Sequence, residues 1–194
     1  MEGGNELFPV FIKLNTLHTI VIGGGAVALE KLHALLNNSP TATITVVALA
    51  LTPDLKFFAK DFPAVTLLEK AYEESDLDRA SLVIVATNNS VLNEQIRIDA
   101  KKRNLLVNFA DKPSLCDFYL GSIVKKGDLK IAISTNGKSP TVAKRLKEIL
   151  NESLPPSLQT TLEQMAELRS KLGGDFAYKV KKLNEVTSIL IKGN

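Results

Sequence analysis

The residues with the clearest chemical meaning form a glycine-rich turn near the amino terminus. Gly23, Gly25 and Ala28 occupy the three small-residue positions of a G-x-G-x-x-G/A motif, between an apolar β-rich run and a helical pattern. In this motif a pyrophosphate approaches the second glycine, and the helix N-terminus offers it free N–H groups. A glycine-rich strand-to-helix turn without a ligand is the alternative. The context favours a dinucleotide, with these predicted contact residues: Gly23, Gly24, Gly25, Ala26 and Val27.

The ribose position of the motif is not filled in the usual way. An Asp or Glu about 20 residues further on normally holds the ribose hydroxyls, and an Arg accommodates a 2′-phosphate. Here the second predicted strand runs into Leu49 and Ala50, and the nearest acid is Asp54. We therefore expect backbone groups or polar residues elsewhere to hold the ribose, with Leu49 and Ala50 as cofactor contacts. The choice between NAD and NADP stays open at this position.

Thr87 and Asn88 follow another predicted strand, Leu82 to Ala86. Ligands of open α/β sheets lie beyond the carboxyl ends of the strands, so these two side chains are candidates for contacts with ribose or nicotinamide. Capping of the next helix is the alternative, and it stays open for both. For Asn89 and Ser90 we favour the capping role.

The elements that must position these residues alternate between apolar strand-like runs and segments with the apolar spacing of a helix. The predicted strands are His18–Ile22, Thr43–Leu49, Val65–Leu68, Leu82–Ala86 and Leu105–Phe109, and the predicted helices are Ala26–Asn37, one from Pro53, and Val91–Arg103. This β-α-β-α-β order predicts an α/β fold with a parallel, Rossmann-like sheet and helices on both faces. The chain then changes to a hairpin, Phe118–Val124 with Leu129–Ser134, and to helices after Ser139 and between Ser157 and Leu190.

These patterns predict three regions: an NAD-binding domain over residues 1–112, a dimerisation and substrate region over 113–152, and a helical carboxy-terminal region over 153–194. The hairpin and the helices are too small to bury their own apolar faces. We therefore expect a homodimer.

Three segments together resemble one protein family. Asn108 to Asp111 follows the last strand of the sheet, the Ile131 to Pro140 segment contains an I-S-T-x-G-x-S-P loop, and both follow the glycine turn in order. The chain resembles the precorrin-2 dehydrogenase family over essentially its whole length. That family includes dehydrogenases, bifunctional dehydrogenase–ferrochelatases and the amino-terminal part of sirohaem synthase.

The resemblance implies NAD-dependent dehydrogenation of precorrin-2 to sirohydrochlorin. It assigns the role of general base to Asp111, whereas the local sequence alone would favour a turn-forming Asp. Asn108 would orient the substrate or Asp111, or would only tie the loop backbone. The tetrapyrrole would lie near a hydroxyl-rich loop, with a plain helix cap by Ser139 as a compatible alternative. The predicted substrate contacts are Ser134, Thr135, Gly137, Lys138 and Ser139.

The remaining reactive side chains are interpreted as structural. Cys116 has an acidic neighbour, which does not stabilise a thiolate, and Asp117 is assigned to a turn rather than to a metal. His18 and His33 lie in a strand and a helix. No metal site is therefore predicted, and a dehydrogenase is favoured over a bifunctional dehydrogenase–ferrochelatase. A non-catalytic NAD-sensing module is a third alternative.

Composition and charge limit the remaining possibilities. The 194 residues contain a single Cys and no apolar run of membrane-spanning length, and the amino terminus is unlike a signal peptide; we expect a cytoplasmic protein. The net charge of +3 hides a stretch, residues 112–147, with eight basic and two acidic side chains. This +6 stretch suits a polycarboxylate such as a tetrapyrrole. Aromatic residues make up only 6% and do not interleave with the basic ones, so a nucleic-acid partner is not expected.

Overall fold

The computed structural model describes residues 4–188, and the chain divides into two compact units, Met1–Leu120 and Gly121–Asn194. We call them the amino-terminal and the carboxy-terminal unit and describe each by itself.

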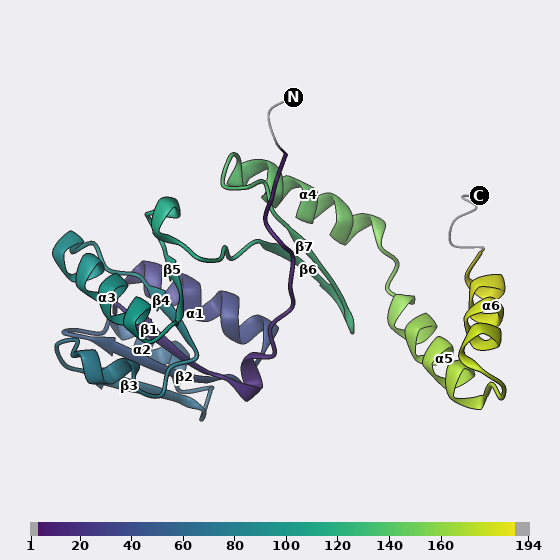
Figure 1. Cartoon of the computed structure of the whole chain (residues 1–194), viewed down its shortest axis with the longest axis horizontal. Helices are drawn as coiled ribbons and strands as arrows, with labels where there is room; N and C mark the ends of the chain where they lie inside the picture. Colours follow the sequence, from purple (N-terminus) through teal and green to yellow (C-terminus); the bar gives the residue numbers. More distant parts are fainter. Residues whose placement is uncertain (1–3, 189–194) are drawn as a thin grey trace. The chain divides into compact units, whose positions relative to one another are not determined.

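The amino-terminal unit is built on a five-stranded parallel sheet (Figure 1). Its strands are β1 (His18–Ile22), β2 (Thr43–Ala48), β3 (Val65–Glu69), β4 (Leu82–Val85) and β5 (Leu106–Phe109), in the spatial order β3-β2-β1-β4-β5. The sheet confirms the predicted parallel α/β architecture. Since all five strands are parallel, the segments after β1, β2, β4 and β5 meet at one edge of the sheet.

Two apolar clusters cover the two faces of this sheet. One cluster joins α1 (Ala26–Asn38) and α2 (Pro53–Ala59) to the sheet, and the other does the same for α3 (Ser90–Lys102) and the short helix η2 (Glu74–Leu77). The central strands β1 and β4 supply residues to both clusters, which explains their continuous apolar sequence. Two further short helices are η1 (Leu14–Thr16) and η3 (Pro113–Leu115).

The carboxy-terminal unit contains an antiparallel hairpin and three helices. The hairpin strands are β6 (Ser122–Lys126) and β7 (Leu129–Ile133), and the helices are α4 (Pro140–Ser153), α5 (Leu158–Lys171) and α6 (Phe176–Thr187). Helix α4 packs on the hairpin and buries Val124 and Ala143 (Figure 1). The predicted last helix extends to Leu190, and its final residues lie outside the described part of the chain. Within residues 4–188, no helix is long and apolar enough to cross a membrane.

The first strand of the hairpin begins later than its sequence predicts. The apolar run starts at Phe118, but β6 starts at Ser122, so this prediction was wrong for four residues. The backbone oxygen of Phe118 accepts a hydrogen bond from Asn108 of β5 at 2.8 Å, which ties it to the amino-terminal unit. At Gly121 a Cβ would lie 2.7 Å from the backbone oxygen of Ile133, so only glycine fits there.

Candidate functional site

The glycine turn joins β1 to α1 at the carboxyl edge of the sheet. Gly23 has a φ of +130°, which L-residues rarely adopt, and its N–H donates to Val47 of β2 at 2.9 Å. Gly24 lies against the segment after β2: a Cβ there would collide with the backbone oxygen of Ala50, and the Gly24 oxygen accepts from Thr52 N at 2.9 Å. The turn and the segment after β2 are therefore held together by backbone contacts.

Gly25 differs from its two neighbours because the space beside it is open. A Cβ there would meet no protein atom within 4 Å, and Gly25 is the N-cap of α1 with no side chain capping the helix. The exposed residues Ala26 and Val27 begin the helix, and Ala28 is fully buried against the sheet. The helix N-terminus thus offers N–H groups to an open, Cβ-free position, which fits the pyrophosphate of a dinucleotide.

The segment after β2 presents exposed groups beside this turn. Leu49 is 81% exposed and Ala50 is also exposed, and their role as cofactor contacts stays a prediction. The segment is anchored by Glu69, the last residue of β3, which accepts a hydrogen bond from Leu51 N at 3.1 Å. The sequence interpretation missed Glu69 because it searched for the acid at the end of β2 itself.

The polar residues after β4 are mainly engaged with one another. Asn89 caps α3 by accepting hydrogen bonds from Val91 N and Leu92 N, which agrees with the capping role favoured for it. The Thr87 hydroxyl donates to the buried Asn93 side chain at 2.6 Å, so Thr87 is half-buried and fixed. Asn88 lies between them and is exposed. Of the two candidates, Asn88 is the one whose side chain is open to solvent.

The loop after β5 is held to the strand by side chains. Asn108 is 95% buried, and its side-chain amide donates a hydrogen bond to the Phe118 backbone oxygen. This contact matches the alternative in which Asn108 only holds the loop backbone. The Cys116 thiol donates to the Phe109 oxygen and accepts from the Phe109 N–H, at 3.2 and 3.1 Å. Burial raises the pKa of this thiol, with a smaller opposing effect of the backbone hydrogen bond. These contacts agree with a structural role for Cys116.

A bidentate ion pair also holds this loop. Asp117 accepts two hydrogen bonds from Arg97 of α3, at 2.6 and 2.9 Å, and one from Val107 N at 3.0 Å. The Arg97 guanidinium lowers the pKa of Asp117 below its ordinary value. The sequence assigned Asp117 to a turn but gave no sign of Arg97, which lies 20 residues away.

Asp111 is left exposed by these contacts. It follows β5 by two residues, and among residues 4–188 its side chain makes no hydrogen bond or ion pair. The structure therefore places Asp111 at the same edge of the sheet as the glycine turn, Leu49, Ala50 and Asn88.

The predicted substrate loop belongs to the carboxy-terminal unit. Thr135 and Ser139 bond to each other through the Thr135 hydroxyl, at 3.1 and 3.2 Å, and Ser139 caps α4 by accepting from Val142 N. Ser134 accepts from Asn136 N, and Gly137 has a φ of +73°. Gly137 and Lys138 are exposed, whereas Thr135 and Ser139 are half-buried. The cap is present, and substrate binding stays a prediction.

Both histidines have structural partners. His18 contacts the Thr45 hydroxyl at 2.9 Å and the Arg79 oxygen at 3.2 Å, and His33 stacks on Phe58 with ring centroids 3.9 Å apart. The described part of the chain holds no group of three His, Cys, Asp or Glu side chains suited to a metal ion.

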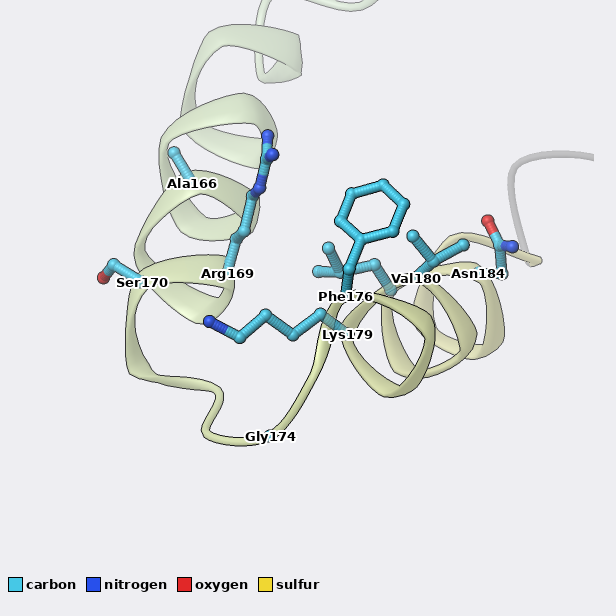
Figure 2. Close-up of a pocket in the computed structure, with 9 residues that line it drawn as sticks. Ala166, Arg169, Ser170, Gly174, Phe176, Lys179, Val180 and Asn184 are labelled. Atoms are coloured by element: carbon cyan, nitrogen blue, oxygen red, sulfur yellow. The ribbon is translucent and has the colours of Figure 1, made fainter.

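A separate groove of about 730 Å³ lies between α5 and α6. Figure 2 shows Arg169 of α5 beside Phe176, Lys179 and Val180 of α6. None of the predicted site residues lines it.

Comparison with known proteins agrees with this geometry. A family model described as putative NAD(P)-binding matches residues 10–122, and one described as sirohaem biosynthesis protein central matches residues 126–153. A siroheme synthase of Pseudoalteromonas atlantica is 40% identical over 162 residues, which cover 84% of this chain and 34% of that protein. One of Citrobacter koseri is 35% identical over 169 residues, 87% of this chain and 36% of that protein. The chain thus spans about a third of the length of these relatives.

The solved structure of SirC, a precorrin-2 dehydrogenase, has a TM-score of 0.74 and 28% sequence identity, and the match covers 93% of this chain and 89% of that one. The parallel sheet, the glycine turn and the first family model define the amino-terminal unit as an NAD(P)-binding domain. The chain as a whole belongs to the precorrin-2 dehydrogenase family.

Proposed function

We propose that the chain catalyses the NAD-dependent dehydrogenation of precorrin-2 to sirohydrochlorin in sirohaem biosynthesis. The observation that carries this proposal is the exposed Asp111 carboxylate. It lies in the loop after β5, at the same edge of the sheet as the glycine turn. Family membership supports the substrate, and the open position at Gly25 supports the cofactor.

In this reaction precorrin-2 loses two hydrogens. NAD supplies the acceptor for the hydride. Asp111 takes the proton from the tetrapyrrole as general base and later releases it to solvent, so the products are sirohydrochlorin, NADH and a proton. Asn108 acts on this step through the loop, because its amide fixes the Phe118 backbone.

The +6 stretch supports binding of the tetrapyrrole carboxylates. It includes the exposed Lys138, which lies in the loop between β7 and α4, two residues before α4 begins. We assign Ser134, Thr135, Gly137, Lys138 and Ser139 to this role.

The test is Asp111→Asn. It removes the base but keeps the side-chain shape, so we expect NADH affinity within about twofold of the wild type and a loss of precorrin-2 oxidation of about 10²-fold or more. NADH binding is followed by fluorescence titration, and oxidation by anaerobic absorbance. Asp61→Asn, at an exposed carboxylate before β3, is the control and keeps full turnover. Wild-type turnover in Asp111→Asn would refute the assigned base.

Two further measurements on the same protein preparation test the two alternative functions. Incubation of sirohydrochlorin with Fe²⁺ or Co²⁺ tests the bifunctional dehydrogenase–ferrochelatase. A non-catalytic NAD-sensing module predicts NADH binding without any affinity for the tetrapyrrole. The exposed Asp111 favours the dehydrogenase over this module, which has no use for such a carboxylate.

We further propose that two copies of the chain associate through the carboxy-terminal unit. Helix α4 exposes Val142, Leu146 and Ile149 by 50%, 42% and 50%, at spacings that place them on one face. A second copy would bury this apolar face. A cytoplasmic location remains the prediction made from the single cysteine.

A further inference from the structure

Glu69 ends β3, directly beside the end of β2, which is where a dinucleotide site usually has its ribose carboxylate. That carboxylate normally ends β2. Here β2 ends with Ala48, whose partner in the parallel register is Glu69, at the end of β3. Paired residues of parallel strands point to the same face of the sheet. Ala48 is the residue that a Cβ on Gly24 would meet at 2.8 Å, so the face that carries Glu69 is the face of the glycine turn.

The two oxygens of the Glu69 carboxylate have different partners. Oε1 accepts from Leu51 N at 3.1 Å and so holds the segment that contains Leu49 and Ala50. Oε2 accepts from the Lys56 ammonium of α2 at 2.7 Å. The hydrogen bond from Lys56 lowers the pKa of Glu69, so the carboxylate stays ionised at neutral pH. Both side chains are nearly half exposed, 44% for Lys56 and 45% for Glu69, so a ligand could approach them.

The Lys56–Glu69 pair would interact differently with the 2′-hydroxyl of NAD and the 2′-phosphate of NADP. A 2′-phosphate is bound by cationic side chains, whereas a carboxylate repels it and can accept hydrogen bonds from ribose hydroxyls. Lys56 is the cation that bonds to Glu69, which balances its charge.

We propose, on the basis of the dehydrogenase function above, that the Lys56–Glu69 pair selects NAD over NADP. Glu69 anchors the Leu49–Ala50 segment and neutralises Lys56, so the ammonium is not offered to a 2′-phosphate. Glu69 thus replaces the acid that the end of β2 lacks.

The test uses titration of the full chain with NADH and NADPH, without any tetrapyrrole. Glu69→Gln keeps an oxygen for Leu51 N but loses the charge, so we expect the ratio of the NADH to the NADPH affinity to fall at least tenfold. The gain in NADPH affinity should shrink at high salt, because a lysine–phosphate contact is screened. Adding Lys56→Met to Glu69→Gln should abolish that gain. Glu69→Ala also loses the loop anchor and should weaken both cofactors.

The control is Glu185→Gln, which neutralises an exposed pair of similar geometry, Lys182–Glu185 at 2.8 Å on α6. It should leave both affinities unchanged. Thermal denaturation of each variant shows whether it folds. An unchanged NADH to NADPH ratio in folded Glu69→Gln would overturn the role of the pair and leave the dehydrogenase intact. A wild-type chain that binds neither cofactor would overturn both.

Discussion

At the scale of residues, the neighbouring glycines Gly24 and Gly25 are needed for opposite reasons. A side chain on Gly24 would meet the chain itself, at Ala48 and Ala50. A side chain on Gly25 would meet only the space in which a ligand phosphate is expected. Substitution can therefore separate a requirement of the fold from a requirement of binding.

We expect Gly25→Ala to lower NADH affinity about tenfold or more, which is at least 1.4 kcal/mol, and to change Tm little. Gly24→Ala should instead destabilise the fold by about 1–3 kcal/mol through overpacking, and so lower Tm by several degrees. Fluorescence titration and thermal denaturation measure the two effects. Wild-type NADH affinity in Gly25→Ala would contradict the placement of the pyrophosphate.

At the scale of elements, the loop after β5 is fixed by side-chain contacts that are distant in sequence. Arg97 of α3 bonds to Asp117 of the loop and Asn108 of β5 bonds to Phe118, while Cys116 of the loop bonds back to the end of β5. The ion pair with Asp117 makes this anchoring dependent on pH. Because its pKa is lowered on folding, Asp117 contributes stability above its unfolded pKa of about 4, and this stability is lost as the pH falls through the folded value.

Asp117→Asn should therefore lower Tm by a few degrees at pH 7, about 1 kcal/mol for a partly exposed pair. The difference from the wild type should shrink as the pH falls below about 4, the unfolded pKa, towards the lowered pKa of the folded carboxylate. Thermal denaturation from pH 3 to 7 measures it. Asp61→Asn is the control, and a difference that stays constant with pH would contradict the assigned role of the carboxylate.

The elements differ in how well the sequence predicts them. Strand β1 and the start of α1 are predicted to the residue, because a strand buried on both faces and a glycine turn are local signals. The start of β6 is not, because Phe118, which the sequence places in this strand, is bonded to Asn108 of β5 instead. Glu69 and Arg97 are missed for the same reason. Their roles depend on which strand or helix is their neighbour, and a single sequence does not state this.

At the scale of the whole molecule, one apolar face of α4 stays exposed in a single chain. We expect Ile149→Asp to convert a dimer to a monomer, because a carboxylate within a buried apolar face is costly. Light scattering after size exclusion measures the mass. Lys144→Glu, on a different face of α4, is the matched control and should leave the dimer intact. A wild-type monomer would contradict the proposed association.

The only thiol of the chain is bonded into the loop that presents Asp111. Its raised pKa and its bonds to Phe109 make it a poor nucleophile while the loop is closed. A thiol reagent would therefore react mainly with molecules in which this loop has detached from β5. The protein thus carries, without any engineering, a single chemical reporter of how often the loop after β5 opens.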